Sequence, residues 1–182
     1  MKRIVFALML LINFAASAAT QRIEIAGSSA SFEQPAGFTA LTIEEIEDKY
    51  PKENGPSLVV GNESRATTIA YTLKDIAITE AQLPEMLAPL TDYMQTELPS
   101  IKWIERKMID FQGQKWIYLE MTSEAIDTDI HNIMLITALE GKMLFFNFNS
   151  TREEFPLIEE SLRQSIDSIR LTPVETPAEV SN

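Results

Sequence analysis

The stretch EAIDTDIHNIML, residues 124–135, contains the single histidine of this 182-residue chain. Asp127 and Asp129 precede His131 by four and two positions. If the segment is extended, all three side chains point to one face, because side chains alternate along a strand. Two carboxylates and an imidazole suit Zn²⁺ or Mn²⁺. Asp127, Asp129 and His131 are therefore the candidate metal ligands.

A simpler interpretation competes with this metal site. Residues 126–129, IDTD, have the composition of a loop. His131 opens an apolar row on its strand that continues with Ile133, Leu135 and Leu139. An imidazole at the end of such a row is usually only hydrogen-bonded, and short motifs often match by chance. We therefore expect no metal and no cofactor, and the metal site remains the alternative.

Other catalytic chemistries find little support in the sequence. The chain has no cysteine, which excludes a thiol nucleophile and a thiolate metal site. A Ser-His-Asp triad would have to use His131, and the G-x-S-x-G motif that presents a serine nucleophile in many hydrolases is absent. The six glycines form neither G-x-G-x-x-G nor a P-loop, so no nucleotide cofactor is expected. We predict that the protein is not an enzyme.

A second candidate surface is the predicted hairpin IKWIERKMIDFQGQKWIY, residues 101–118. Aromatic and arginine side chains dominate the binding energy of many protein interfaces. The hairpin combines aromatic and basic residues in an otherwise acidic chain, and its partner-binding candidates are Lys102, Trp103, Arg106, Lys107, Lys115 and Trp116. The alternative is a solvated hairpin whose tryptophans close the core. Strand alternation does not place both tryptophans and all four cations on one face.

The two ends of the chain indicate export and a single domain. Residues 1–19 combine two basic residues, a short apolar run and small residues around Ala18, the order of a cleaved signal peptide. The run is shorter than the roughly 20 residues that span a bilayer. Residues 172–182 contain two prolines and two glutamates and predict a disordered tail. Residues 20–171 then form one domain, periplasmic or secreted, without a membrane span.

Charge limits the kinds of partner. The formal net charge is -12. Such a domain repels nucleic acid over most of its surface, so we expect no nucleic-acid partner. Acidity also keeps a protein soluble and is compatible with a monomer. The expected partner is an envelope protein.

Three helices are predicted by their caps and apolar spacing. Thr42 and Glu45 form a capping box ahead of a short helix that ends before Pro51. A helix over residues 80–98 carries one apolar stripe, and Pro89 should kink or restart it. A last amphipathic helix is predicted to begin at Thr151.

Strand patterns fill the rest of the domain. Residues 21–42 predict strand, turn and strand, and residues 57–75 predict an antiparallel pair. Four strands from residue 101 to 149 have short connections, which predicts an antiparallel meander. The last two strands are apolar on both faces and need a layer above and below. The pattern predicts an α+β fold with a single antiparallel sheet covered by helices.

The order of these pieces resembles the PsbP-like superfamily, which includes the DcrB-like bacterial proteins. The resemblance rests on loose motifs: FEQPAGF, IDFQGQKWIYLEM, HNIMLITALEGKMLFFNFNS and the closing SIDSIRL. It implies an α/β/α sandwich with a central antiparallel sheet and two main packing helices. It also implies no shared catalytic centre, because members act by binding other proteins.

The expected function is therefore a non-catalytic protein-binding module of the bacterial cell envelope. Two alternatives stay open. One is an immunity or chaperone-like protein of a secretion system, and the other is a small metal-dependent hydrolase centred on His131.

Overall fold

The structure is a computed structural model that describes residues 20–50, 55–56, 58–124 and 128–171. The leader predicted at 1–19, the tail predicted at 172–182 and Asp127 of the candidate metal triad lie outside the described residues. Within the described ranges, no helix has both the length and the apolar character needed to cross a membrane.

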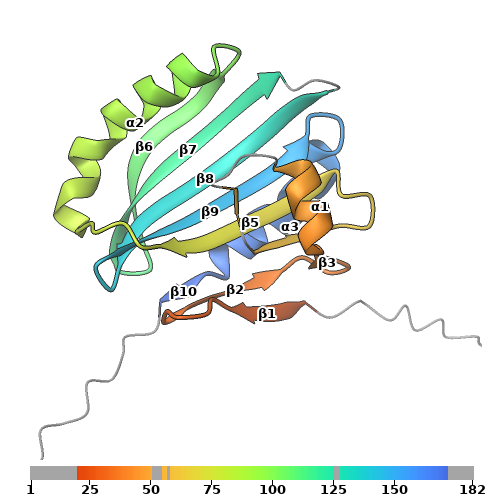
Figure 1. The fold of residues 1–182 in the computed structure, drawn as a ribbon, viewed down its shortest axis with the longest axis horizontal. Helices are drawn as coiled ribbons and strands as arrows, with labels where there is room; N and C mark the ends of the chain where they lie inside the picture. The colour runs from red at the N-terminus through yellow and green to blue at the C-terminus, as the bar shows by residue number, and fades with distance from the viewer. Residues whose placement is uncertain (1–19, 51–54, 57, 125–127, 172–182) are drawn as a thin grey trace, which may run out of the picture.

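A seven-stranded antiparallel sheet forms the centre of the fold (Figure 1). Its spatial order is β3-β4-β5-β9-β8-β7-β6, so β6 lies at one edge and β3 at the other. The strands are β3 (Thr39–Ala40), β4 (Val59–Gly61), β5 (Thr67–Lys74), β6 (Lys102–Phe111), β7 (Gln114–Glu124), β8 (Asp129–Leu139) and β9 (Lys142–Thr151). The antiparallel pair and the four-stranded meander predicted from the sequence are confirmed.

Two tight turns set the register of the meander. Gln112 and Gly113 join β6 to β7, and Glu140 and Gly141 join β8 to β9. All four residues have positive φ, between 53° and 76°. Two consecutive residues with positive φ match the right-handed twist of a hairpin, and the glycine removes the steric cost at the second position.

A second, three-stranded sheet corrects the prediction of a single sheet. It has the order β1-β2-β10 and comprises β1 (Gln21–Glu24), β2 (Ala30–Gln34) and β10 (Arg170–Leu171). Phe32 of β2 packs edge-on against Tyr71 and Phe146 of the large sheet, with ring centroids 4.9 and 5.5 Å apart. Seven strands spaced about 4.8 Å apart are far wider than one helix about 10 Å across. The small sheet therefore covers area that a single helix leaves open.

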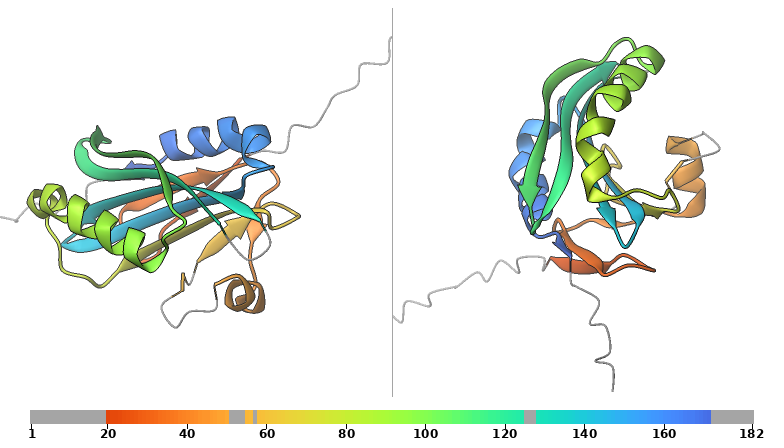
Figure 2. Two further views of the ribbon diagram at one scale, coloured as in Figure 1. Left: turned by 90° about the horizontal axis from the view of Figure 1, so that it is seen from above. Right: turned by 90° about the vertical axis from the view of Figure 1, so that its left-hand side faces the viewer.

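The long helices lie on opposite faces of the large sheet (Figures 1 and 2). Helix α2 (Leu83–Glu97) follows a 3₁₀ turn at Glu80–Gln82 and packs on β6 and β7. Helix α3 (Phe155–Asp167) packs on β2 and β9. The predicted α/β/α sandwich with two main packing helices is confirmed, and the small sheet lies in the same layer as α3.

Two helix boundaries differ from the sequence prediction. Helix α2 runs through Pro89 without a break, because Pro89 is exposed and the carbonyl it frees can be solvated by water. Helix α3 begins at Phe155 rather than at Thr151, since β9 continues to Thr151 in its pairing with Ile130. The Thr151 hydroxyl still accepts a hydrogen bond from the Glu154 backbone N–H, at 3.3 Å.

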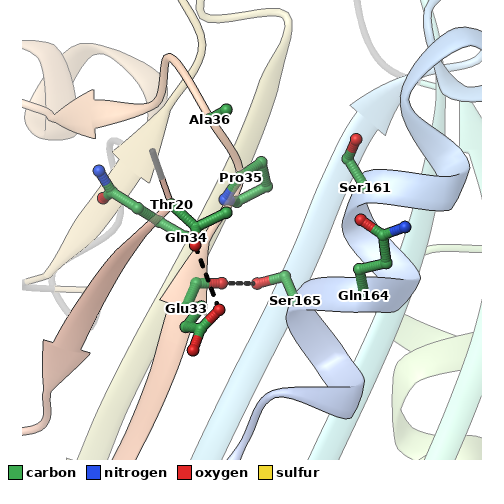
Figure 3. Close-up of a pocket in the computed structure, with 8 residues that line it drawn as sticks. All are labelled: Thr20, Glu33, Gln34, Pro35, Ala36, Ser161, Gln164 and Ser165. Carbon is green, nitrogen blue, oxygen red and sulfur yellow. Dashed lines mark hydrogen bonds between the residues drawn. The ribbon is translucent and has the colours of Figure 1, made fainter. Parts of the chain in front are cut away.

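Helix α3 is joined to the small sheet by a direct hydrogen bond. The Ser165 hydroxyl donates to the backbone carbonyl of Glu33 at 2.5 Å (Figure 3). Beside this contact lies a hollow of about 260 Å³ between the end of β2 and α3. The FEQPAGF segment supplies one wall of it, through Glu33, Gln34, Pro35 and Ala36.

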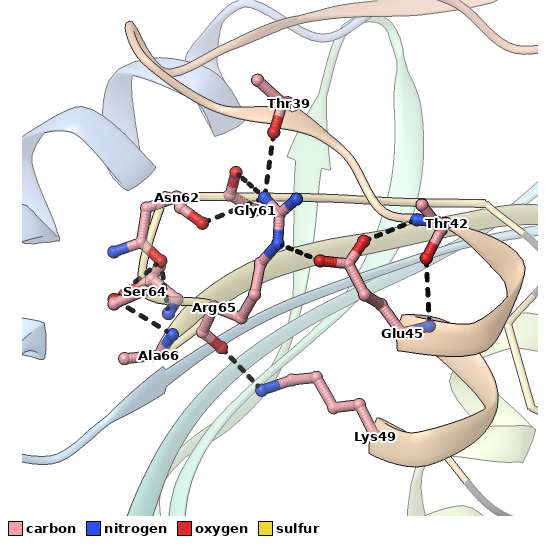
Figure 4. A network of polar contacts seen from close by, with 10 residues as sticks. Thr39, Thr42, Glu45, Lys49, Gly61, Asn62, Ser64, Arg65 and Ala66 are labelled. Carbon is pink, nitrogen blue, oxygen red and sulfur yellow. Dashed lines mark hydrogen bonds and ion pairs between the residues drawn. The ribbon is translucent and has the colours of Figure 1, made fainter.

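Helix α1 (Ile43–Lys49) has no fully buried residue and is held by Ile46, which packs on the small apolar cluster of Leu41, Val59 and Ala70, and by polar contacts. Its predicted capping box between Thr42 and Glu45 is present. Arg65, in the turn between β4 and β5, donates to Glu45 at 2.9 Å and to Thr39 Oγ1 and the Gly61 carbonyl (Figure 4). Arg65 therefore ties α1 to the β3 edge of the large sheet.

Replacing Arg65 by alanine should loosen α1 selectively. We expect the free energy of unfolding to fall by only about 1 kcal/mol, since the pair is partly solvated. Amide hydrogen exchange over residues 43–49 should become faster, while exchange in β7 and β8 stays unchanged. A uniform increase in exchange across the sheet would contradict this local role.

Candidate functional site

His131 lies in β8 on the face of the large sheet that carries α3. Its side chain is buried, with 8% of the residue exposed. The Nε2 atom lies 2.8 Å from Oε1 of Glu120, on the neighbouring strand β7. The imidazole also stacks on the ring of Phe155, the first residue of α3, with centroids 3.5 Å apart and an interplanar angle of 8°. The histidine is thus enclosed between two strands and a helix.

Glu120 is the centre of a polar cluster that we call the Glu120 cluster: the buried Tyr118, Glu120 and His131 and the partly exposed Arg163. The Tyr118 hydroxyl donates to Glu120 Oε2 at 2.5 Å. Arg163, on α3, donates to Glu120 Oε1 at 3.2 Å and forms a second ion pair with Glu159 at 2.7 Å. Both carboxylate oxygens of Glu120 therefore have donors, contributed by β7, β8 and α3.

The cluster shifts the protonation of its members. Burial by itself would raise the pKa of Glu120, but hydrogen bonds from His131 and Tyr118 and the charge of Arg163 lower that pKa to about 2. Burial and the bond to Glu120 raise the pKa of Tyr118 to about 12. At neutral pH Glu120 is an anion and Tyr118 is neutral. The Nε2 atom of His131 must then donate its proton to the carboxylate.

The candidate metal ligands are engaged elsewhere. Asp129 is the first residue of β8, where a loop was expected from the sequence, and it forms an ion pair with Arg152 at 3.0 Å. The Nε2 atom of His131 is occupied by Glu120. Among the described residues, no three His, Asp or Glu side chains are arranged to hold a metal ion. Because Asp127 lies outside the described residues, the complete triad of Asp127, Asp129 and His131 stays a prediction.

A serine also neighbours the histidine, through strand pairing. Ser150 of β9 is the register partner of His131. The hydroxyl of Ser150 lies 2.7 Å from the hydroxyl of Thr67, and both residues are fully buried. A nucleophile has to reach its substrate, so this serine is placed for packing and hydrogen bonding rather than for attack.

A groove opens beside the Glu120 cluster, between β6 and α3. It has a volume of about 380 Å³ and its walls are Glu105, Lys107, Ile109, Phe111, Tyr118, Glu120, Arg163, Ile166 and Asp167. Lys107 lies over the ring of Tyr118, 5.3 Å from its centroid, and pairs with Glu105 at 2.8 Å. The groove brings charges of both signs next to the edge strand.

The hairpin residues predicted as a partner surface are divided between the two faces of the sheet. Trp116 has 0% exposure on the α3 face, where its Nε1 donates to the Phe111 carbonyl at 2.9 Å. Trp103 is half-buried on the α2 face and donates to Gln95 at 2.8 Å, with Arg106 above its ring. Trp116 is therefore a core residue and contributes no surface, and the two tryptophans do not share a face.

The remaining hairpin cations lie on exposed positions. Lys102 and Lys107 are exposed along β6, and Lys115 pairs with Asp110 at 2.9 Å near the turn. Ile104, which was not among the candidates from the sequence, is 56% exposed on the same strand. The register of β6 against β7 shifts between Trp103 and Glu105, which marks Ile104 as a bulged residue.

Glu120, Tyr118 and Arg163 were not predicted from the sequence. One signal was available: Glu120 interrupts the apolar run WIYLEM of a central strand, and a buried carboxylate needs partners. Tyr118 is two residues away on the same strand, but His131 and Arg163 could not be identified in this way, because they come from a neighbouring strand and from a helix 43 residues further along the chain.

The chain is similar in structure to proteins of known fold, although not in sequence. No protein-family model matches the chain, and no curated protein sequence matches it. Among solved structures, the chain is similar to cyanobacterial PsbP (CyanoP) from Synechocystis sp. PCC 6803. The TM-score is 0.58 and the identity 15%, over 88% of this chain and 97% of that one.

The chain is also similar to LpqN of Mycobacterium tuberculosis, a protein described as involved in cell envelope biogenesis. Here the TM-score is 0.55 and the identity 12%, over 85% of this chain and 92% of LpqN. The structural similarity shows a shared fold. At identities this low, no functional residue of either protein can be assigned to a position of this chain. On the strength of these likenesses and of its own sheet order and helices, the chain has a PsbP-like fold.

Proposed function

We propose that the protein is exported and acts in the bacterial cell envelope as a non-catalytic module that binds another protein along the edge strand β6. The observation that carries the proposal is the free edge itself. Strand β6 spans ten residues, Lys102–Phe111, and among the residues that the structure describes it pairs only with β7. An unpaired strand edge is a template for an added strand from a partner, which is a common mode of peptide recognition.

The side chains of β6 favour an acidic partner. The strand carries Lys102, Arg106 and Lys107 against Glu105 and Asp110, so it has an excess of cations in a chain of net charge -12. Complementary charge speeds encounter and discriminates among partners. Exposed Ile104 supplies an apolar anchor between the cations. A second copy of β6 would meet like charge and a bulge, which supports a monomer.

Export is supported by the leader-like sequence of residues 1–19 and by the likeness in fold to LpqN, whose described role is in the cell envelope. A periplasmic or secreted location follows from the leader. The absence of cysteine agrees with a stability that rests on a packed core alone.

Site-specific crosslinking tests the edge directly. A photoreactive amino acid that replaces Ile104 in the mature protein should give one dominant crosslinked adduct with a partner protein in envelope extract. The matched control is position 43, because Ile43 is 77% exposed on α1 near the opposite edge of the sheet. There we expect no adduct, because α1 lies far from β6.

A charge reversal separates specific binding from chance contact. With the crosslinker at 104, the change Arg106→Glu should reduce the adduct about tenfold, while the matched change Arg22→Glu on the small sheet should leave it intact. Equal adducts at 104 and 43, or an adduct insensitive to Arg106→Glu, would refute the edge as the binding site.

A further inference from the structure

The groove between β6 and α3 has an apolar end. Ile109 and Phe111 of β6 are half-buried there, and Ile166 of α3 is a third apolar wall. The volume of about 380 Å³ falls within the range of sites that hold a small molecule, roughly 300–1,000 Å³. All of its walls lie within the described ranges of the chain. The groove is therefore large enough for a ligand and partly apolar.

Helix α3 determines where its charged groups lie along the groove. Phe155, at the start of the helix, stacks on His131, which pairs with β7 near the end of that strand. Arg163, about two turns later, bonds Tyr118 in the middle of β7. The helix therefore runs toward the turn between β6 and β7, and Asp167, one turn beyond Arg163, lies about 6 Å closer to that turn. This is the apolar end of the groove, because β6 leads into the same turn.

Asp167 is the one charged wall of the groove that has no opposite charge beside it. Lys107 pairs with Glu105 at 2.8 Å, and Arg163 pairs with two carboxylates, one of them Glu120 at 3.2 Å. Asp167 is exposed, and no cation among the described residues lies within ion-pair distance of its carboxylate. The charge that remains uncompensated in the groove is therefore negative.

Arg163 is the cation on α3 nearest in sequence to Asp167, but its hydrogen bonds are made elsewhere. Residues four apart are neighbours on a helix, so Arg163 is placed to reach either Glu159 or Asp167. Its Nε donates to Glu159 at 2.8 Å, and its terminal nitrogens donate to Tyr118 and Glu120 at 3.2 Å each. A move to Asp167 would take this cation away from the buried carboxylate of Glu120, which is costly. The carboxylate of Asp167 is therefore left open.

The end of α3 favours a cation at the same place. A helix carries a partial negative charge at its C-terminus, which attracts positive groups. The last turn of α3 contains Asp167 and no basic residue. Arg170 donates to the backbone carbonyls of Asp167 and Ile169 at 2.8 Å each, and the Asp167 carboxylate is not its acceptor. A positive ligand group can therefore reach this carboxylate from the groove.

We propose that the groove between β6 and α3 binds a small apolar amine. The protonated amine pairs with the carboxylate of Asp167, and the apolar body packs on Ile109, Phe111 and Ile166. The ligand is a small molecule, so the proposal does not depend on the addition of a partner strand to β6.

Three probe molecules of similar size and different charge test this proposal. They are 2-phenylethylamine, 2-phenylethanol and 3-phenylpropionate, each titrated into the mature protein at neutral pH and followed by amide chemical shifts. The amine should shift residues 109–111 and 163–167. It should bind about fivefold more tightly than the alcohol, which is the upper end for an ion pair that water still reaches. The propionate should bind most weakly of the three.

Matched variants separate the groove from the general attraction of cations to an acidic protein. Asp167→Asn should make the affinities for amine and alcohol equal. Asp92→Asn removes the same charge from an exposed position of α2, on the other face of the sheet, and should leave the preference intact. Ile109→Ala should weaken the amine and the alcohol about equally, because both lose the same apolar contact. Thermal unfolding of each variant shows whether the fold is intact.

Four outcomes would overturn the proposal. They are an absence of shifts along the groove at millimolar amine, equal affinity of the native protein for amine and alcohol, tighter binding of the propionate, and an unchanged preference in Asp167→Asn. None of them bears on strand addition at β6, because Ile104, where the crosslinker is placed, is not a wall of the groove.

Discussion

Replacing Glu120 by glutamine should lower the free energy of unfolding by about 3 kcal/mol at neutral pH. The change keeps the size of the side chain but removes the charge on which His131, Tyr118 and Arg163 converge. Removing one partner of a buried, hydrogen-bonded ion pair typically costs about 3–5 kcal/mol, and the expected loss lies at the lower end because His131 and Tyr118 stay buried whereas Arg163 is 42% exposed. Equilibrium unfolding in urea measures the loss.

The loss of stability at low pH gives a second measurement of the contribution of Glu120 to the free energy of unfolding. Folding lowers the pKa of Glu120 from 4.5 to about 2, so the unfolded chain takes up the proton first as the pH falls. The contribution of Glu120 is complete above pH 4.5 and disappears between pH 4.5 and about 2. Each tenfold difference in proton affinity between the folded and unfolded chain is worth about 1.4 kcal/mol, which brings the contribution to roughly 3 kcal/mol. The Glu120→Gln variant should lack this part of the acid dependence.

An exposed ion pair supplies the matched control. Glu33 bonds Arg22 at 2.7 Å on the small sheet, and about a third or more of each side chain is exposed. The change Glu33→Gln should cost less than about 1 kcal/mol, since water screens such pairs. If the two variants lose equal amounts of unfolding free energy, burial does not explain the contribution of the Glu120 cluster to stability.

Replacing Trp116 by alanine should destabilise the protein by about 4 kcal/mol. The side chain is fully buried among Phe111 and Phe146, and a large buried aromatic leaves a cavity when it is truncated. Because the alanine variant is close to the limit of what a small domain tolerates, Trp116→Phe serves as a milder form. We expect it to lose about half as much. Chemical denaturation of both variants gives the values.

Trp103 is the matched control for Trp116. It belongs to the same hairpin but is half-buried on the opposite face, with its ring nitrogen bonded to Gln95 of α2. The change Trp103→Ala should cost clearly less, about 2 kcal/mol, since less area returns to water. Equal losses at the two positions would show that the two faces of the hairpin are packed alike, in conflict with the different burial of the two rings.

The opening histidine motif shows where reasoning from sequence succeeds and where it ends. The alternation of His131 with Ile133 and Leu135 correctly placed it on a buried strand face, because the period of two depends only on the chain itself. Its bond to Glu120 depends on the register between β7 and β8, and its stacking on Phe155 depends on where α3 docks. Neither contact can be predicted from the spacing of residues along the chain.

The hairpin gives a second example. Composition identified an unusual group of cations and tryptophans between Lys102 and Trp116. The bulge at Ile104 puts Trp103 and Glu105 of β6 on opposite faces of the sheet although they are two residues apart, whereas the faces of Lys115 and Trp116 follow the regular alternation of β7. One extra residue in a strand moves every preceding side chain of that strand to the opposite face of the sheet. The β-propensities of the residues do not reveal where such an extra residue lies.

By itself, the sequence determined the antiparallel meander, the cap of α1, the apolar faces of α2 and α3 and the α+β class, because capping, turn chemistry and hydrophobic period are local properties. Tertiary structure alone decided that β1, β2 and β10 form a separate sheet, that β6 is the last strand of the large sheet and that Glu120 has three hydrogen-bond partners. These features bring together residues as far apart as Ser31 and Arg170. Contacts over such separations are selected by the packing of the whole core, where the fit of each element depends on all the others.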